Sequence, residues 1–299
     1  MEHRALARCH QEGQRSAVPS VARRTLWIRK SRAGTGSVVA AGGVSPGTTT
    51  SAAVAVEGHR QVHYQKLWLT GKQPTSTTTT VVYSPLVTNV GERELFHFTH
   101  VRNLCDILAE KQLVSDTVMQ SRGGVLRECG DRAVKAERRT RRITVPPYGC
   151  PADYVPFYFA PRSPMLYVIS RGGVATYQDG QPPLVYLVTS VSGVQESHRP
   201  YVFSDGNCAS EITRHFTDLS MMPSVVDWEI MAAPYWANTA DDGDRMRRRM
   251  AELLVYGHLP VTALHEVATY DHDHAQQVRH LLGEAGAKLP VSVRPKWYY

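Results

Sequence analysis

The sequence lacks several features that would place the protein in a common class. Its five cysteines are odd in number and include no C-x-x-C pair, so they indicate neither a disulfide framework nor a metal site. No apolar run reaches the roughly eighteen residues that a membrane span needs, and the first thirty residues contain no apolar signal-peptide core. We therefore expect a reduced, cytoplasmic protein without a membrane anchor.

The motifs of several large enzyme classes are missing as well. There is no G-x-x-x-x-G-K-[ST], no G-x-G-x-x-G after a strand, no G-x-S-x-G and no H-E-x-x-H. These absences argue against P-loop, Rossmann, α/β-hydrolase and zincin chemistry. The Asp271–His274 run suits helix capping better than metal binding, and we expect no metal.

Positive charge is unevenly distributed along the chain. Residues 1–90 contain eleven Lys and Arg against three Glu, a net charge of +8, and residues 91–299 contain 23 basic and 24 acidic residues. The first part also carries Gly-, Ser-, Thr- and Ala-rich tracts such as Gly34–Thr50, which cannot bury enough apolar surface to fold. We interpret 1–90 as a disordered, basic, low-complexity extension and 91–299 as the folded domain.

The folded domain should begin with a strand at Glu94–His100, where apolar and aromatic residues alternate. Thr99 can cap the helix that the apolar spacing from Val101 to Leu108 predicts. His97 and Thr99 then stand near the carboxyl end of a strand. Taken alone, a histidine there is more often a packed or exposed residue than a ligand.

The longest distinctive stretch is Asp153–Ile169, in which Pro161 and Pro164 flank Arg162 between two apolar, aromatic runs. Proline belongs at strand ends, so we expect a strand, a rigid corner and a second strand. A simple interpretation makes Arg162 a cap for backbone carbonyls in a buried turn.

Two further segments carry charged residues that could take part in binding or catalysis. The run Gly130–Arg142 contains six basic residues and is by default a solvated face. Near the carboxyl end, Glu252 follows the four arginines within Arg245–Arg249 and precedes an apolar, strand-like run. A lone glutamate there would normally be a salt-bridge partner, but its position also suits a fixed catalytic carboxylate.

In their order along the chain, these segments resemble the DarT family, toxins that transfer ADP-ribose from NAD to bases of single-stranded DNA. The resemblance covers about Leu95 to Tyr299 and is carried by His97-Phe98-Thr99, by the basic run before Asp153–Ile169, and by Arg-x-x-Met-Ala-Glu-Leu-Leu-Val around Glu252. It implies that His97, Phe98 and Thr99 hold NAD together with Arg138, and that Arg138 and Glu252 are catalytic. It further implies a substrate-binding set of Asn207, Arg139, Tyr154 and Arg162, with Arg139 also the alternative catalytic arginine.

The chemistry of these side chains agrees with such roles. A guanidinium almost never loses its proton, so we assign Arg138 the stabilisation of an anionic base rather than proton removal. A carboxylate at Glu252 can stabilise the oxocarbenium-like ribose that forms when nicotinamide leaves.

The resemblance implies an α+β ADP-ribosyltransferase-like fold, with split β-sheets around an NAD cleft and flanking helices. Residues 132–142 and 245–249 should line the DNA side. The expected partners are single-stranded DNA, with thymidine as the target, and a DarG-like macrodomain antitoxin, and we expect a monomer. The alternatives are an ADP-ribosyltransferase acting on RNA or protein, an NAD glycohydrolase, and an inactive nucleic-acid-binding module.

Overall fold

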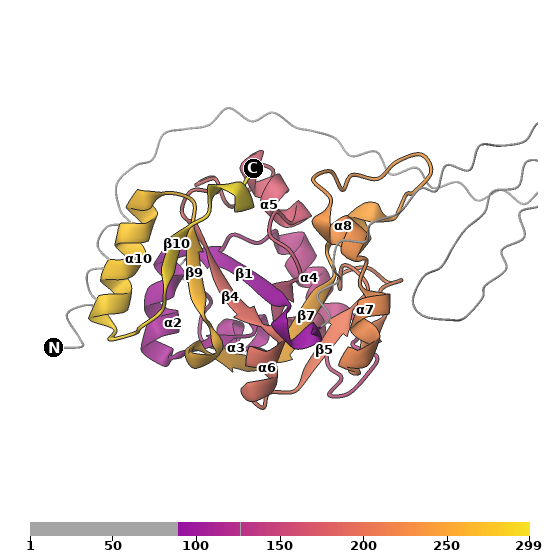
Figure 1. Cartoon of the computed structure of the whole chain (residues 1–299), viewed down its shortest axis with the longest axis horizontal. Coiled ribbons are helices and arrows are strands. Elements are labelled where there is room, and N and C mark those ends of the chain that lie inside the picture. The colour runs from indigo at the N-terminus through magenta and orange to yellow at the C-terminus, as the bar shows by residue number, and fades with distance from the viewer. Residues whose placement is uncertain (1–88, 126) are drawn as a thin grey trace, which may run out of the picture. The chain divides into compact units, whose positions relative to one another are not determined.

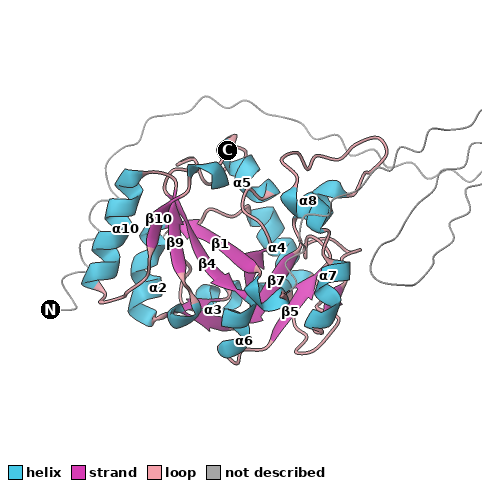
Figure 2. Cartoon of the chain, viewed as in Figure 1, coloured by secondary structure: helices cyan, strands magenta, loops and turns pink. Residues whose placement is uncertain are grey.

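The computed structural model describes residues 89–299 except Leu126, so the extension predicted over 1–90 lies almost wholly outside the described residues. Its centre is an eight-stranded sheet in the order β10-β9-β4-β1-β3-β7-β5-β6, with β2 and β8 forming a separate pair (Figures 1 and 2). All neighbours pair antiparallel except β9 and β10. The strands are β1 (Glu94–His100), β2 (Gln112–Val114), β3 (Tyr154–Tyr158), β4 (Leu184–Ser190), β5 (Tyr201–Ser204), β6 (His215–Phe216), β7 (Glu252–Tyr256), β8 (His258–Pro260), β9 (Glu266–Thr269) and β10 (Val291–Val293).

Short helices cover the sheet (Figure 2). They are α2 (Leu104–Glu110), α3 (Asp116–Ser121), α4 (Arg132–Thr140), α5 (Pro164–Ser170), α6 (Val191–Glu196), α7 (Met222–Val225), α8 (Trp228–Ala232), α9 (Arg245–Arg249) and α10 (His272–Glu284). Among the described residues, no helix has the length and apolarity to cross a bilayer.

The alternation of side chains along β1 divides the core into two parts. Leu95 packs into a large cluster that includes Phe157 and Leu253, whereas Phe96 and Phe98 pack into a second cluster on the other side. Successive residues of a strand point to opposite faces, so both faces of the sheet are buried in this region.

The sheet is weakly joined between β1 and β3. Phe96 and Tyr158 form the one Cα pair between these strands, whereas seven pairs join β1 to β4. Pro156 lies two residues before Tyr158 and has no N–H to donate, so it cannot extend the ladder toward β1. Its carbonyl oxygen instead lies 2.9 Å from His97 Nδ1. The predicted α+β fold is confirmed, but these strands form one large sheet rather than split sheets, with its narrowest pairing between β1 and β3.

Two local predictions were wrong. His100, rather than Thr99, caps the turn after β1, since its ring nitrogen accepts a hydrogen bond from Arg102 N. The second half of the central stretch is α5 rather than a strand, because Ser163 caps it and Pro164 occupies its first turn, where proline needs no N–H. The sequence signal for a helix start was present, but the apolar run obscured it.

His100 should make the stability of the domain depend on pH. Burial lowers its pKa from 6.5 to about 4, against the opposing charge of Asp179 and with a smaller contribution from nearby cations. The unfolded chain therefore binds a proton more readily, and stability that is complete above pH 6.5 is lost as the pH falls toward 4. Between pH 7 and 5, the free energy of unfolding should fall by about 2 kcal/mol more in the native protein than in His100→Asn. Urea denaturation at both pH values tests this, and equal losses in the two proteins would contradict it.

Candidate active site

Glu252 is the first residue of β7 and its side chain is only 1% exposed. Its Cα lies opposite that of Tyr158 on β3, and its backbone N–H donates to Ser204 Oγ at 3.0 Å. The hydroxyl of Ser204 in turn donates to the Gly206 carbonyl at 2.7 Å. The carboxylate is therefore held on a central strand with its backbone fixed from β5.

Arg138 reaches this carboxylate from α4, more than a hundred residues earlier in the chain. Its two terminal nitrogens donate to the two oxygens of Glu252 at 2.8 and 2.9 Å. The side chain of Asp131 caps the start of α4 by accepting from two backbone N–H groups, which fixes the helix that presents Arg138. A bidentate pair of this kind fixes both direction and distance. The sequence placed both residues in one site, and the structure brings them into contact.

Burial and charge act in opposite directions on Arg138. Burial alone would lower the pKa of its guanidinium, but the charge and hydrogen bonds of Glu252 raise that pKa above its usual value. The guanidinium of Arg138 therefore stays ionised inside the protein. The backbone N–H of Cys208 adds a third bond to Glu252 Oε1 at 3.3 Å. Removing either partner of such a pair would leave an uncompensated buried charge and destabilise the protein.

His97 and Thr99 lie in a different cleft. They line it together with residues of α2, β2 and α3, among them Asn103, Ile107 and Met119. Burial lowers the pKa of His97, while its bond to the Pro156 carbonyl acts in the other direction. The hydroxyl of Thr99 accepts from Asn103 Nδ2 at 3.0 Å. The predicted histidine–threonine pair is thus assembled, but against the first helix after β1.

The structure does not gather all predicted NAD residues in one pocket. Phe98 faces the same side of the sheet as Tyr158, with the rings stacked at 6.4 Å, and this is also the side of Glu252. His97 and Thr99 project from the other face of β1, and β3 separates their strand from β7. Two strand spacings separate the backbones by about 10 Å. A dinucleotide that contacts both groups would have to cross the β1–β3 junction.

The predicted substrate-binding residues fall into two groups. Asn207 lies in the loop that leads to Cys208, and its side chain accepts from Ala209 N at 2.9 Å. Arg139 is next to the catalytic candidate but turns outward to pair with Asp116. Arg139 is the sequence neighbour of Arg138, and Asn207 precedes Cys208, whose backbone N–H donates to Glu252.

Tyr154 and Arg162 are engaged elsewhere. Tyr154 is 1% exposed at the far end of β3, where its hydroxyl donates to the Tyr148 carbonyl. Arg162 has a left-handed backbone at φ 57° and its guanidinium lies 4.5 Å from the centre of the Tyr299 ring. Its carbonyl accepts from the Tyr299 hydroxyl. The geometry of both residues is that of packing, so their contact with substrate remains a prediction that the structure does not favour.

Two residues beside Glu252 received no role from the sequence. Tyr158 is directly opposite Glu252, and burial, reinforced by the charge of Glu252, raises the pKa of its hydroxyl. Ser204 holds the Glu252 backbone from β5. The apolar, aromatic first half of Asp153–Ile169 predicts a strand, but the register of β3 against β7 is needed to place Tyr158 beside the carboxylate.

We predicted that the arginines of α9 line the DNA side, and for the partly exposed Arg245, Arg247 and Arg248 this stays a prediction. Arg249 is buried, and each of the four arginines has partners within the protein. These partners are the carbonyls of Tyr235 and Ala237 for Arg245, Asp205 and Asp244 for Arg247, Asp227 and Asp242 for Arg248, and the carbonyls of Ile230, Met231 and Pro161 for Arg249. These bonds and ion pairs hold the segment that leads into β7, the strand that begins with Glu252.

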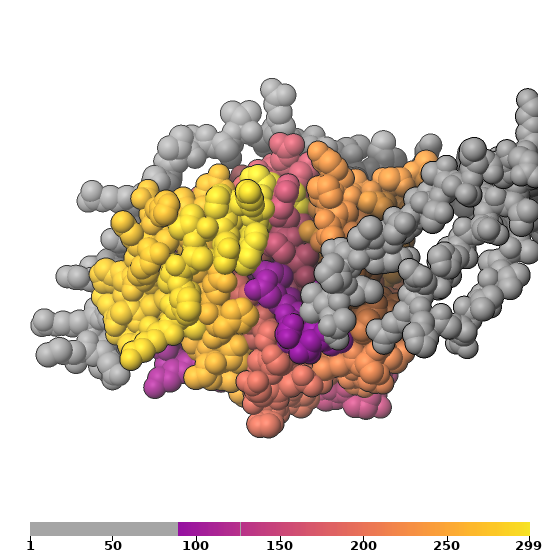
Figure 3. Space-filling model, in the orientation of Figure 1, coloured from indigo at the N-terminus to yellow at the C-terminus, as the bar shows by residue number. Residues whose placement is uncertain are grey.

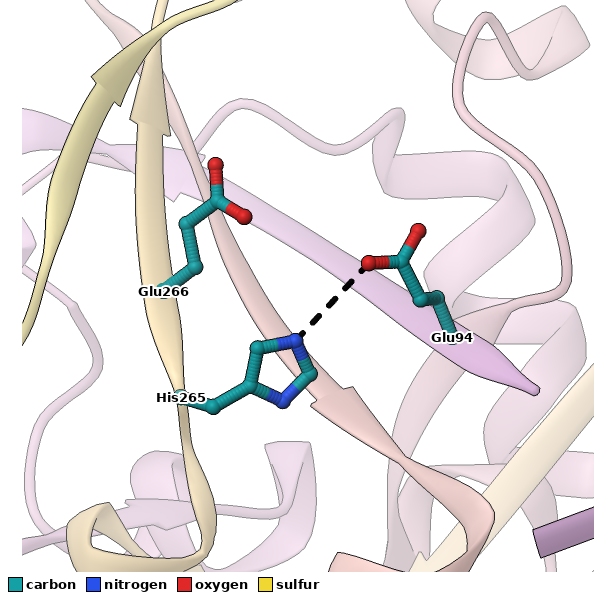
Figure 4. A group of neighbouring side chains, drawn as sticks. All are labelled: Glu94, His265 and Glu266. Atoms are coloured by element: carbon teal, nitrogen blue, oxygen red, sulfur yellow. Dashed lines mark ion pairs between the residues drawn. The ribbon is translucent and has the colours of Figure 1, made fainter. Parts of the chain in front are cut away.

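One group of side chains has the ligand types of a metal site. Ligand atoms of Glu94, His265 and Glu266 lie within 4.8 Å of one another, and His265 pairs with Glu94 (Figure 4). Glu266, however, already accepts from Ser292 and Arg294. The charge of Arg294 offsets that of Glu266, so this exposed group offers little to a cation. Among the described residues, no ligand set of this kind includes Glu252.

Comparison with known proteins adds the family. A family model described as DarT, ssDNA thymidine ADP-ribosyltransferase, matches residues 96–299, more than half of the chain. The chain belongs to the DarT family. A DNA ADP-ribosyl transferase of Mycobacterium tuberculosis is 34% identical over 209 residues, covering 69% of this chain and 88% of the relative. A DNA ADP-ribosyl transferase of Thermus sp. (strain 2.9) is 34% identical over 207 residues and is covered over 95% of its length.

Solved structures of DarT proteins have the same fold. The Thermus sp. 2.9 DarT in complex with ADP-ribosylated ssDNA superposes with a TM-score of 0.64 at 33% identity, covering 69% of this chain and 96% of that one. The same protein in complex with NAD+ gives a TM-score of 0.61 at 32% identity. The predicted family, enzyme class and fold are thereby confirmed. The roles of individual DarT residues in this chain remain predictions.

Proposed function

We propose that this DarT-family chain transfers ADP-ribose from NAD to thymidine in single-stranded DNA. The observation that carries the proposal is the buried, bidentate Arg138–Glu252 pair, formed by the two residues that the family resemblance designates as catalytic. Support for the substrates comes from the relatives, one of which was solved with NAD+ and with ADP-ribosylated ssDNA.

The pair suits the two halves of the reaction. The bond between the ribose C1′ and the nicotinamide nitrogen breaks, and nicotinamide leaves with the bonding electrons as a neutral ring. Glu252 stabilises the positive charge that develops on the ribose and accepts a hydrogen bond from a ribose hydroxyl. The thymine nitrogen that attacks C1′ loses its proton to water, and Arg138 stabilises the negative charge on the base.

NAD binding should rearrange the pair. In the structure, both oxygens of Glu252 accept from Arg138 and Oε1 also accepts from Cys208 N, so Oε2 keeps a free acceptor position for a ribose hydroxyl. We expect NAD to draw Arg138 toward its pyrophosphate, to which a guanidinium donates two directed bonds. His97, Phe98 and Thr99 would then contact the nicotinamide half across the weak β1–β3 junction.

A biological role can be proposed from membership of the DarT family. We propose that the enzyme is the toxin of a toxin–antitoxin pair, acts in the cytoplasm as a monomer without a metal, and is opposed by a macrodomain hydrolase. A relative from Thermosipho africanus supports the last point, because it is a DNA ADP-ribosyl transferase–DNA ADP-ribosyl glycohydrolase fusion protein, although it is only 23% identical.

The acceptor can be identified with one panel of substrates. Purified protein is incubated with labelled NAD and one acceptor at a time: single-stranded DNA with a single thymidine, the same strand without thymidine, its duplex, RNA of the same sequence, and a mixture of proteins. We expect label only on the thymidine-containing single strand, at the base. Label on RNA or protein, or release of nicotinamide without transfer, would contradict the proposed acceptor.

A further inference from the structure

We propose that Tyr235 is a stacking platform for an unpaired base next to the target nucleotide, which deepens the proposed function and rests on it. Tyr235 follows α8 and is 84% exposed, more than any other large hydrophobic side chain among the described residues. The next most exposed tyrosine is Tyr148, at 55%. A single exposed ring is ordinary on a protein surface, so the case for Tyr235 depends on the groups that surround it.

The backbone that carries Tyr235 is fixed, although it belongs to a loop. Arg245 donates to the Tyr235 carbonyl at 2.9 Å and to the Ala237 carbonyl at 3.1 Å. Trp236 Nε1 donates to the Tyr299 hydroxyl at 2.9 Å, so the neighbouring residue is anchored on the other side. A ring on a fixed backbone loses little conformational freedom on binding, which favours stacking.

A different arginine, Arg249, connects the helix before Tyr235 to the strand of Glu252. Arg249 lies three residues before the carboxylate and donates to the carbonyls of Ile230 in α8 and Pro161 after β3. The loop after α8, the helix α5 and the carboxyl-terminal residues adjoin at the top of the surface in Figure 3, in agreement with the edge-on contact of Trp236 with Tyr167 at 5.8 Å. The distance between Tyr235 and the site is thus set by packed structure rather than by a free loop.

Cations accompany the aromatic rings at this place. Arg171 lies 5.4 Å from the centre of the Tyr167 ring, which itself contacts Trp236, the neighbour of Tyr235. Aromatic rings beside arginines are the combination that binds single strands, in which base faces are unstacked and phosphates are near. A duplex hides its base faces, so the platform would also favour single-stranded over double-stranded DNA.

The test compares Tyr235→Ala and Tyr235→Trp with the native protein, and Tyr148→Ala serves as a matched control for loss of an exposed tyrosine ring. Affinity is measured for a thymidine-containing single strand and for strands with one abasic site at each flanking position in turn. NAD cleavage without DNA is measured for every variant. Tyr235→Ala should bind the intact strand about tenfold or more weakly, from the usual strength of one base stack.

The abasic strands make the inference specific. At one flanking position, removal of the base should weaken binding to the native protein and to Tyr235→Trp, but should have no further effect on Tyr235→Ala. NAD cleavage and binding by Tyr148→Ala should stay within twofold of native. Unchanged binding by Tyr235→Ala, or equal abasic losses in Tyr235→Ala and native protein, would overturn the platform while leaving transfer to thymidine intact. Failure of the native protein to modify any DNA would instead overturn the proposed function.

Discussion

Glu252→Gln should lower both NAD cleavage and transfer to DNA by about 10²- to 10³-fold, the usual loss when a preorganised electrostatic group is removed from an active site. Glutamine preserves the shape of the side chain but cannot balance positive charge on the ribose. It also leaves Arg138, which now donates two bonds to the carboxylate, with a neutral partner. The measurement is nicotinamide release and labelled DNA at saturating NAD, with thermal unfolding recorded in parallel.

The surface pair of Glu211 and Arg141 provides a matched control. Glu211 also accepts from an arginine, at 2.6 Å, but its side chain is 77% exposed. Glu211→Gln should keep both activities within twofold, since exposed pairs contribute little. If Glu252→Gln retained more than a tenth of native NAD cleavage, the carboxylate would not be the group that stabilises the ribose.

Arg138→Lys should reduce transfer by about a hundredfold while leaving the fold intact. Lysine keeps the charge next to Glu252 but cannot make the two parallel bonds that fix the pair, and it presents no planar fork to a pyrophosphate or a base. Arg138→Ala should additionally destabilise the protein by about 3–5 kcal/mol, because Glu252 is left buried and unpaired. Single-turnover transfer and urea denaturation separate the two effects.

Arg139→Lys decides between the two arginines that the sequence left open. Arg139 pairs with Asp116 and its side chain is 40% exposed, so this variant should keep transfer within about twofold. Strong loss in Arg139→Lys with normal transfer in Arg138→Lys would shift the catalytic role by one residue. Equal losses would instead point to a general requirement for positive charge on α4.

The sequence predicted well where short-range patterns carried the information. Alternation identified the strand that contains His97, an apolar run identified the strand that begins at Glu252, and the family motif pointed to Arg138 with Arg139 as the alternative. These outcomes depend on local pattern or on motif identity. None requires knowledge of which segments meet in space.

The sequence did not predict the register between strands or which side chains pair with one another. The position of Tyr158 opposite Glu252 depends on how β3 pairs with β7, and a shift of one residue would send the side chain to the other face. The partners of the α9 arginines could not be predicted either, because some of them lie far away in sequence, up to 88 residues for Arg249 and Pro161. A local count of charges cannot distinguish a solvated basic face from buried guanidinium groups that are already paired.

The most direct measurement is a crystal structure of Glu252→Gln with NAD bound. We expect the nicotinamide ribose to lie within hydrogen-bonding distance of residue 252, with Arg138 moved to the pyrophosphate or to the acceptor side, and with the dinucleotide crossing the β1–β3 junction toward His97. A structure in which NAD occupies only the cleft of His97 and Thr99, while residue 252 still faces Arg138, would contradict a catalytic centre built on this pair.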